Sequence, residues 1–299
     1  MSRIHDALKR AEQERATSMG THVEPSFEQP EAPPMAMPPL NGSGMTGMPA
    51  VSDLSFETLL ARCPQTEWHP DPLTMLFFGA DENRLGTEEF RTLRSRLYQI
   101  REKMPLKRLL VTSALPKEGK SFVAANLAQV LVRQHGRRAL VIDADLRNPG
   151  MHRHLGTSQT PGLSDYLLGE CDEFSTLQRG PMENLFFLPA GRLVPSAPEL
   201  LANGRLKLLL QRVEPLFDWI ILDSSPVVPV SDSTLVAHVC DGVLLVVRSN
   251  MTPSHLARRA REEFPDKLLL GVVLNGAATD KMTRSKYYYG EAVGSHAGD

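Results

Sequence analysis

The sequence predicts an α/β protein with a doubly wound, mainly parallel sheet. Short apolar runs rich in β-branched residues alternate with helical or turn-rich segments along the second two thirds of the chain. The runs are apolar throughout instead of alternating, which is typical of strands covered by helices on both faces. The intervening segments are long enough for the crossovers that parallel strands need, so ligands are expected at the carboxyl ends of the strands.

Six segments carry the strand pattern, and one helix precedes them. The strands are RLLVTS (108–113), RALVIDAD (138–145), NLFFLP (184–189), DWIILD (218–223), GVLLVV (242–247) and LLLGVVLN (268–275). Residues 87–104 predict a helix, because Phe90, Leu93 and Leu97 recur at spacings of three and four. The apolar face of this helix is expected to pack on the core.

The rest of the chain divides by composition. Residues 1–18 contain a narrow amphipathic helical pattern, and residues 19–52 are rich in Pro, Met, Gly and Ser without a period. We expect a disordered linker that tethers this helix to a domain spanning residues 53–280, followed by a flexible tail, 281–299. The helix fits docking onto another protein, and a terminus without function is the alternative.

Composition and charge restrict the classes of function. Of the 299 residues 41% are hydrophobic, enough for a sizeable core, and the net charge of −2 gives no reason to expect a nucleic-acid partner. Cys63, Cys171 and Cys240 lack metal or redox spacing and are expected to be reduced thiols of a cytoplasmic protein. There is no secretory-signal pattern, and no apolar run reaches the roughly 18 to 20 residues of a membrane span. Membrane association is therefore expected only through a partner.

The segment after the first strand predicts a phosphate-binding loop. RLLVTS leads into ALPKEGKS and then into the helical FVAANLAQVLVRQ, which is the strand, loop and helix order of a P-loop. Loop N–H groups are expected to face the β-phosphate, with Lys120 on the phosphates and Ser121 on Mg²⁺. Ala114 replaces the first glycine of the general motif, which is tolerable if its φ is negative. A chance G-K-S at a helix start is the alternative. The predicted nucleotide-binding residues here are Ala114, Pro116, Lys117, Glu118, Gly119, Lys120, Ser121 and Phe122.

Acidic residues end two of the strands. Asp143 and Asp145, in VIDADLRNP, are two residues apart and are expected to point the same way. Such carboxylates repel each other unless a divalent cation joins them, although an exposed acidic turn is the alternative. Asp223 ends WIILD, the usual place of the carboxylate that orients a Mg²⁺-bound water in P-loop proteins. With Lys120, these residues predict a Mg-ATP site.

Four further residues lie near these motifs. Arg147 offers a cation beside the acidic pair and is predicted to bind nucleotide. Asn275 ends GVVLNG where related P-loop folds contact adenine, and a strand-ending turn residue is an equal alternative. His152 and His154 are expected to be a solvated pair more than a metal site, because no third ligand is visible.

These motifs resemble the bacterial tyrosine kinases of polysaccharide co-polymerase systems. The resemblance covers about residues 84–289, and its most specific parts are TSALPKEGKS, VIDADLRNP, GLSDYLLGE, LPAG with PSAPELL, and LDSSPVVPVSD followed by DGVLLVVR. It implies the deviant-Walker P-loop fold, shared with partitioning and cell-division-site ATPases. Those ATPases carry a signature lysine where this chain has Leu115, so their sandwich dimer is not expected. The start, SRIHDALKRAE, resembles the kinases that accompany exopolysaccharide export.

The resemblance also implies partners. Glu88, Arg91 and Arg94 match the family's oligomerisation motif, in which this helix meets the nucleotide site of a neighbour and builds a ring. An ordinary charged pair on a solvated helix face is the alternative. A separate transmembrane co-polymerase is implied as the partner that holds and activates the kinase at the inner membrane.

The C-terminal tail contains the predicted phosphoacceptors. Tyr287, Tyr288 and Tyr289 are consecutive in the polar segment TRSKYYYGEAVGSHAGD, where a core position is hard to justify. In the family, the tail of one subunit enters the active site of the next. Each phosphate would add about −1.5 to −2 charge and so loosen the ring. Docking of the rings on the domain surface is the alternative.

The resemblance therefore implies an ATP- and Mg²⁺-dependent tyrosine autokinase that controls capsule or exopolysaccharide assembly or export. The predicted catalytic residues are Lys120, Asp143, Asp145 and Asp223, and the predicted metal ligands are Ser121, Asp145 and Asp223. Asp143 is favoured as proton acceptor for the phenol, although Asp143 and Asp145 are interchangeable on sequence grounds. An ATP-switched positioning protein and an interaction module with a vestigial site are the competing hypotheses.

Overall fold

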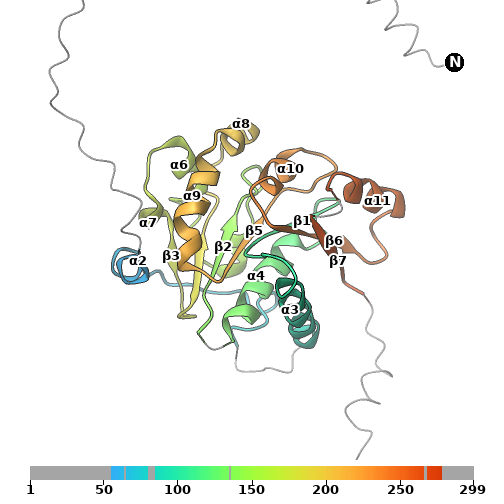
Figure 1. Cartoon of the computed structure of the whole chain (residues 1–299), viewed down its shortest axis with the longest axis horizontal. Coiled ribbons are helices and arrows are strands. Elements are labelled where there is room, and N and C mark those ends of the chain that lie inside the picture. The colour runs from blue at the N-terminus through green and yellow to red at the C-terminus, as the bar shows by residue number, and fades with distance from the viewer. Residues whose placement is uncertain (1–54, 64, 80–84, 135, 266–267, 278–299) are drawn as a thin grey trace, which may run out of the picture. The chain divides into compact units, whose positions relative to one another are not determined.

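The structure, a computed structural model, describes residues 55–63, 65–79, 85–134, 136–265 and 268–277. These residues build a seven-stranded sheet in the order β3-β4-β2-β5-β1-β6-β7, with helices packed against it (Figure 1). The predicted N-terminal helix, the linker and the tail with Tyr287, Tyr288 and Tyr289 lie outside the described residues, so the domain limits stay predictions.

The strands are β1 (Arg108–Ser113), β2 (Ala139–Asp143), β3 (Gln178–Arg179), β4 (Leu185–Leu188), β5 (Trp219–Asp223), β6 (Gly242–Arg248) and β7 (Leu269–Asn275). The helices are α2 (Phe56–Arg62), α3 (Thr87–Arg101), α4 (Lys120–Val132), α5 (Met151–Leu155), α6 (Leu163–Leu168), α7 (Glu173–Thr176), α8 (Ala197–Ala202), α9 (Arg205–Val213), α10 (Asp232–Ala237) and α11 (Ser254–Glu262), with a 3₁₀ turn at Glu214–Leu216. Within the described part of the chain, no helix combines the length and apolar character that crossing a membrane requires.

The sheet confirms the prediction of a mainly parallel architecture. All six predicted strands are present, and every neighbouring pair is parallel except β3 with β4. Strand β3 was not predicted, because two residues are too few to show a periodic pattern. The second strand was predicted to reach Asp145 but ends at Asp143. The Asp145 N–H bonds the Asp143 carboxylate at 3.2 Å, so the chain has turned out of the ladder there.

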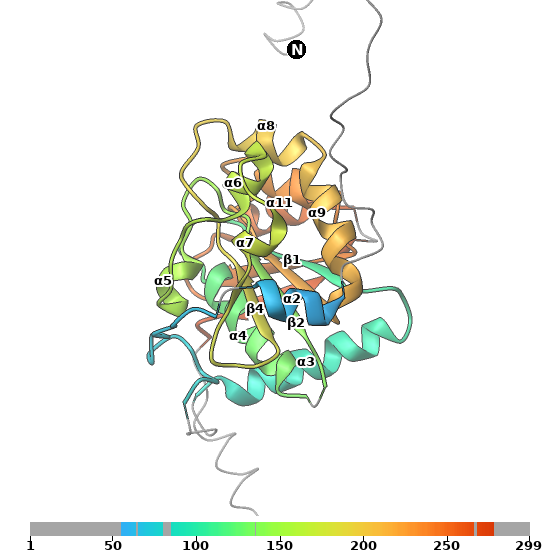
Figure 2. The same cartoon turned by 90° about the vertical axis from the view of Figure 1, so that its left-hand side faces the viewer.

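Helices cover both faces of the sheet (Figures 1 and 2). Leu109 and Val111 of β1 pack with α3, α4 and α5, whereas Leu110 packs with the layer formed by α6 to α10. Successive side chains of a strand point to opposite faces, which is why a strand covered twice is apolar throughout. Phe90 and Leu97 of α3 are buried in the first layer, as their spacing predicted.

Polar side chains on α4 hold the turn-rich segment 71–79, which precedes α3 in the sequence. Asn126 Oδ1 accepts a hydrogen bond from Leu76 N at 2.8 Å, and Asn126 Nδ2 donates to Thr74 O at 2.8 Å. One turn further on, Gln129 Oε1 accepts from Phe77 N at 3.2 Å. These backbone N–H and C=O groups do not take part in the sheet, and α4 supplies their hydrogen-bond partners. Inside the core a polar group without a partner costs free energy. The segment and α4 therefore form one packed unit.

We expect the Asn126→Ala variant to lose roughly 2–3 kcal/mol of unfolding free energy, because the Leu76 N–H and the Thr74 carbonyl would be left buried without partners. Urea unfolding measures the loss. The exposed Gln99→Ala in α3 is the control and should stay within about 0.5 kcal/mol of the parent protein. Equal stability of the two variants would contradict this role for Asn126.

Candidate active site

The predicted site residues meet at the carboxyl ends of three neighbouring strands. In the sheet β5 lies between β2 and β1, so Asp143 at the end of β2 is the register partner of Asp223 at the end of β5. Lys120 begins α4 directly after β1 and its loop. Parallel strands thus bring together residues that are about a hundred positions apart, at the edge where α/β sheets bind ligands.

Lys120 points at the carboxylates. Its Nζ lies 2.8 Å from Asp145 Oδ2 and 3.6 Å from Asp223 Oδ1, and its side chain is only 12% exposed. Burial alone would lower the pKa of Lys120, but the charges of Asp223 and Asp145 outweigh it and raise the pKa. The ammonium group therefore stays protonated and partly neutralises the buried acids.

The carboxylates of Asp143 and Asp223 have strongly altered acidity. Burial, followed by repulsion from Asp223, raises the pKa of Asp143 to about 7, although Asp143 accepts hydrogen bonds from the N–H groups of Gly150 (3.2 Å) and Met151 (3.1 Å). Burial likewise raises the pKa of Asp223 to about 6 against the opposing charge of Lys120. Such shifts mark functional sites when they coincide with a cleft of converging groups.

The arrangement fits a magnesium nucleotide. Both carboxylate oxygens of Asp223 are buried and accept no hydrogen bond from the described residues, which leaves them free to face a cation or its water. Ser121 adjoins them, with its hydroxyl oxygen 3.3 Å from Lys120 Nζ. Among the described residues, no three His, Cys, Asp or Glu side chains form a complete metal site. Mg²⁺ in nucleotide sites takes one or two carboxylates together with substrate phosphates and water.

The loop between β1 and α4 has the local geometry that a phosphate loop needs. Of the described non-glycine residues only Lys117 and Asn250 have positive φ, so Ala114 meets the condition set for its substitution. Gly119 has a φ of 95°, and a Cβ there would lie 2.1 Å from Asn275 Nδ2. The positive φ favours glycine at this position, and a larger residue would also displace the Asn275 side chain.

Two predicted nucleotide ligands bond to the protein itself in this structure. Arg147 donates from Nε and Nη2 to the buried carboxylate of Asp232, at 2.6 and 3.1 Å. Asn275 Nδ2 donates to Glu118 O at 2.8 Å. The sequence argument did not assign a role to Asp232, although it lies inside the motif LDSSPVVPVSD. Contacts of Arg147 and Asn275 with nucleotide stay predictions.

The histidine pair and Phe122 have packing roles. His152 and His154 are half-buried instead of fully solvated, and burial lowers the pKa of both. His154 Nδ1 lies 3.2 Å from the hydroxyl of Thr74, which ties α5 to the segment bound by α4. The Phe122 ring meets Phe90 edge to face at 5.8 Å between centroids, and so joins α3 to the first turn of α4.

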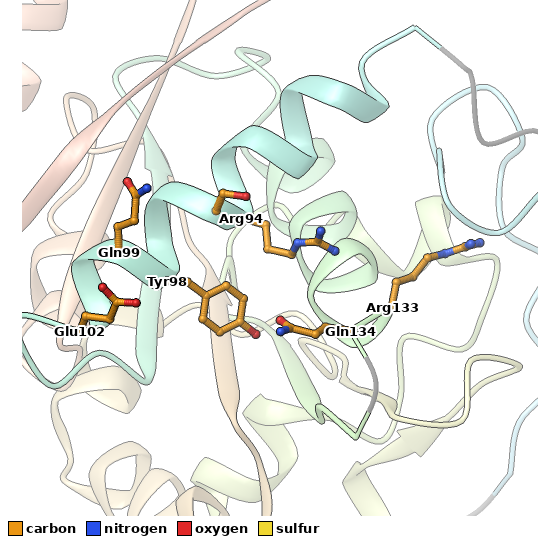
Figure 3. A pocket seen from close by; sticks show the side chains of 7 residues that line it. Arg94, Tyr98, Gln99, Glu102, Arg133 and Gln134 are labelled. Atoms are coloured by element: carbon orange, nitrogen blue, oxygen red, sulfur yellow. The ribbon is translucent and has the colours of Figure 1, made fainter.

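The predicted oligomerisation motif on α3, formed by Glu88, Arg91 and Arg94, is only partly turned toward solvent. Glu88 and Arg91 pair with each other, whereas Arg94 Nη1 donates to Val130 O of α4 at 3.1 Å. Figure 3 shows a hollow beside Arg94 that is lined by Arg94, Ser95, Tyr98, Gln99, Glu102, Arg133 and Gln134. Arg133 follows the C-terminal end of α4, so this hollow lies about 20 Å along the helix from Lys120 and is separate from the predicted nucleotide site.

Comparison with known proteins identifies the family. No family model matches the chain. Over 206 residues it is 34% identical to tyrosine-protein kinase YwqD of Bacillus subtilis, covering 68% of this chain and 86% of that protein. Over 207 residues it is 30% identical to the putative tyrosine-protein kinase CapB of Staphylococcus aureus, covering 69% and 90%. The chain belongs to the bacterial tyrosine-protein kinase family.

Solved structures agree with that assignment. The kinase domain of the Escherichia coli tyrosine kinase ETK superposes with a TM-score of 0.57 at 30% identity, covering 64% of this chain and 77% of that one. The chimerical protein CapA2B2 gives a TM-score of 0.65 at 26% identity, covering 75% and 100%. The predicted fold is therefore confirmed as that of a bacterial tyrosine kinase domain.

The raised pKa of Asp223 gives a pH-dependent prediction. Its ordinary value is 3.8 and its folded value is about 6, so between these pH values the unfolded chain loses its proton first. Stability therefore falls as pH rises through this window, and the buried charge is a cost above it. We expect Asp223→Asn to melt above the parent protein at pH 8, by about 2–4 °C for each kcal/mol that burying the charge costs, with little difference at pH 4.

Asp241→Asn is the matched control with the opposite sign. Hydrogen bonds from Arg108 outweigh burial and lower the pKa of Asp241, so its charge stabilises the fold at neutral pH. That variant should melt below the parent protein at pH 8, as thermal unfolding followed by circular dichroism will show. At each pH the melting temperature of Asp223→Asn is compared with that of the parent protein. A difference that is more negative at pH 8 than at pH 4 would contradict the raised pKa of Asp223.

Proposed function

We propose that this protein is an ATP-dependent tyrosine autokinase that phosphorylates the tyrosine cluster of a second copy of itself. The observation that carries the proposal is the convergence of Lys120, Asp145 and Asp223 at the β1, β2 and β5 strand ends, in a chain of the tyrosine-protein kinase family. Bound Mg²⁺ would add charge neutralisation on the phosphates. Phosphoryl transfer needs such positioning and neutralisation more than covalent chemistry.

The carboxylates differ in the roles that they suit. Asp145 is paired with Lys120 at 2.8 Å and Asp223 has both oxygens free of hydrogen bonds, which suits them to the metal side together with Ser121. A pKa of about 7 suits Asp143 to accept the proton of a tyrosine hydroxyl, because a general base works best near the ambient pH. We therefore assign Asp143 as the base.

The tail is proposed as the substrate because it is long enough to reach another subunit and because its tyrosine hydroxyls can accept a phosphoryl group. Tyr287 follows Asn275 by twelve residues, and a chain of that length spans at most about 40 Å. This is enough to reach a neighbouring subunit. We propose that Glu88 and Arg91 of α3, which pair on the helix surface, face that neighbour in a ring-like homo-oligomer.

The proposed setting is the assembly or export of an exopolysaccharide or capsule. Among the relatives is the succinoglycan biosynthesis transport protein ExoP of Rhizobium meliloti, which is 35% identical over 184 residues. This chain covers 23% of that relative, which is much longer. We propose that the kinase acts on the cytoplasmic side of the inner membrane, held there by a transmembrane co-polymerase. No contact among the described residues favours a positioning ATPase instead.

Incubation with Mg-ATP and phosphotyrosine mapping by mass spectrometry test the proposal. Phosphate is expected on Tyr287, Tyr288 or Tyr289, and Lys120→Met should reduce it by roughly 100-fold or more, because a main phosphate contact is lost. ATP turnover without phosphotyrosine would contradict the kinase assignment and favour the positioning ATPase.

Two full-length variants, each unable to phosphorylate itself, reveal whether the phosphoryl group is transferred between copies of the chain. Lys120→Met keeps the tyrosines, whereas a chain with all three tail tyrosines changed to Phe keeps the active site. Mixing the two should place phosphate on the Lys120→Met chain. If the Lys120→Met chain stays unmodified in the mixture while the parent protein labels itself, transfer is within one chain.

A further inference from the structure

Glu118 places a carboxylate inside the loop that is expected to hold phosphates. It is 3% exposed, and it immediately precedes the glycine and lysine of the motif. No ion pair neutralises it among the described residues, since Lys120 points to Asp145 and Asp223 instead. A buried negative charge close to an anion-binding loop opposes phosphate binding unless it is held back.

Two neutral donors bind this carboxylate. Glu118 Oε2 accepts a hydrogen bond from Leu115 N at 2.7 Å, and Glu118 Oε1 accepts one from the hydroxyl of Thr252. Thr252 Oγ1 in turn accepts from Arg248 N at 3.1 Å. Because the hydroxyl is already an acceptor for that N–H, its own proton is directed to Glu118.

Neighbouring side chains fix the same part of the loop from outside. Arg248 Nη1 donates to Lys117 O at 3.0 Å, where Lys117 has the positive φ of 66° that a side chain rarely adopts. Asn275 Nδ2 donates to Glu118 O at 2.8 Å. The ends of β6 and β7 and the turn before α11 therefore hold the loop residues 117–118 in place, although they lie far from the motif in sequence.

We propose that Thr252 is a positioning residue of the nucleotide site, whose hydroxyl holds the Glu118 carboxylate on the loop's own backbone and away from the phosphates. The inference rests on the proposed nucleotide site and adds to it a residue outside the loop. Without the hydroxyl, Glu118 keeps only the Leu115 N–H as a hydrogen-bond donor. Its negatively charged carboxylate can then rotate toward the bound anion. Nucleotide affinity then falls through charge repulsion, while the chemical step is untouched.

Substitutions at Thr252 test this without relying on kinase activity. Thr252→Val removes the hydroxyl at nearly constant volume, and Thr252→Ser keeps it. Equilibrium titration with a fluorescent ADP analogue and Mg²⁺ should show about tenfold weaker binding for Thr252→Val, and binding within about twofold of the parent protein for Thr252→Ser. Amide hydrogen exchange of the loop residues 115–119 should be faster in Thr252→Val.

A double-mutant cycle separates charge from general loosening of the loop. In a Glu118→Gln background there is no charge to hold, so Thr252→Val should weaken binding by less than about twofold. If the Thr252→Val chain does not fold, Thr252→Ala replaces it, and the same loss of about tenfold is expected because Glu118 again loses the hydroxyl donor.

The outcomes are distinguishable. Parent-like binding by Thr252→Val, an equal loss in Thr252→Ser, or the same loss in the Glu118→Gln background would each overturn the role of Thr252. A parent protein that binds nucleotide but leaves its tyrosines unmodified would overturn the kinase proposal and leave this inference standing.

Discussion

The ion cluster of one lysine and three buried carboxylates at the strand ends is the constraint on which the rest of this structure depends. Lys120 is held 2.8 Å from Asp145 and 3.6 Å from Asp223, and Asp143 lies in register with Asp223. Burial raises the pKa values of Asp143 and Asp223 toward neutrality, with added repulsion from neighbouring carboxylates, and the single charge of Lys120 only partly opposes the rise. The protein keeps unfavourable charge in place, and a second cation at this edge would relieve it.

The fold supplies the rigidity that such a cluster needs. Strand β5, buried along its whole length, lies between β1 and β2, so the backbone positions of Asp143 and Asp223 are fixed by the ladder. On the helical side, α4 is buried from Val123 to Val132, and its Asn126 fixes the segment that crosses it. Strain and repulsion of this kind persist only where surrounding packing determines the geometry, as it does here.

The elements with strong periodicity were predictable, and the contacts between distant segments were not. The apolar run of β1 and the spacing of Phe90 and Leu97 on α3 follow directly from burial on known faces. The phosphate-loop motif and the acidic strand ends also predicted which strand ends meet around Lys120. The pairing of Arg147 with Asp232 could not be predicted from the sequence, because the two residues are eighty-five positions apart and only the sheet order brings them close. The end of β2 was misjudged because the Asp143 carboxylate accepts a hydrogen bond from the N–H of Asp145, two residues further on, and so ends the strand locally.

A loop motif is thus only part of a phosphate site. The sequence ALPKEGKS shows which groups the loop contains, but not that Thr252 and the Leu115 N–H bind the two oxygens of Glu118, which we propose keeps this carboxylate away from a bound anion. Those donors come from the loop itself and from the turn after β6, the same turn that shapes Lys117 through Arg248. Because β7 follows this turn and precedes the tyrosine tail along the chain, the residues that shape the phosphate loop lie on the strands that lead to the proposed substrate. The loop residues 117–118 and the ends of β6 and β7 are therefore parts of one hydrogen-bonded unit.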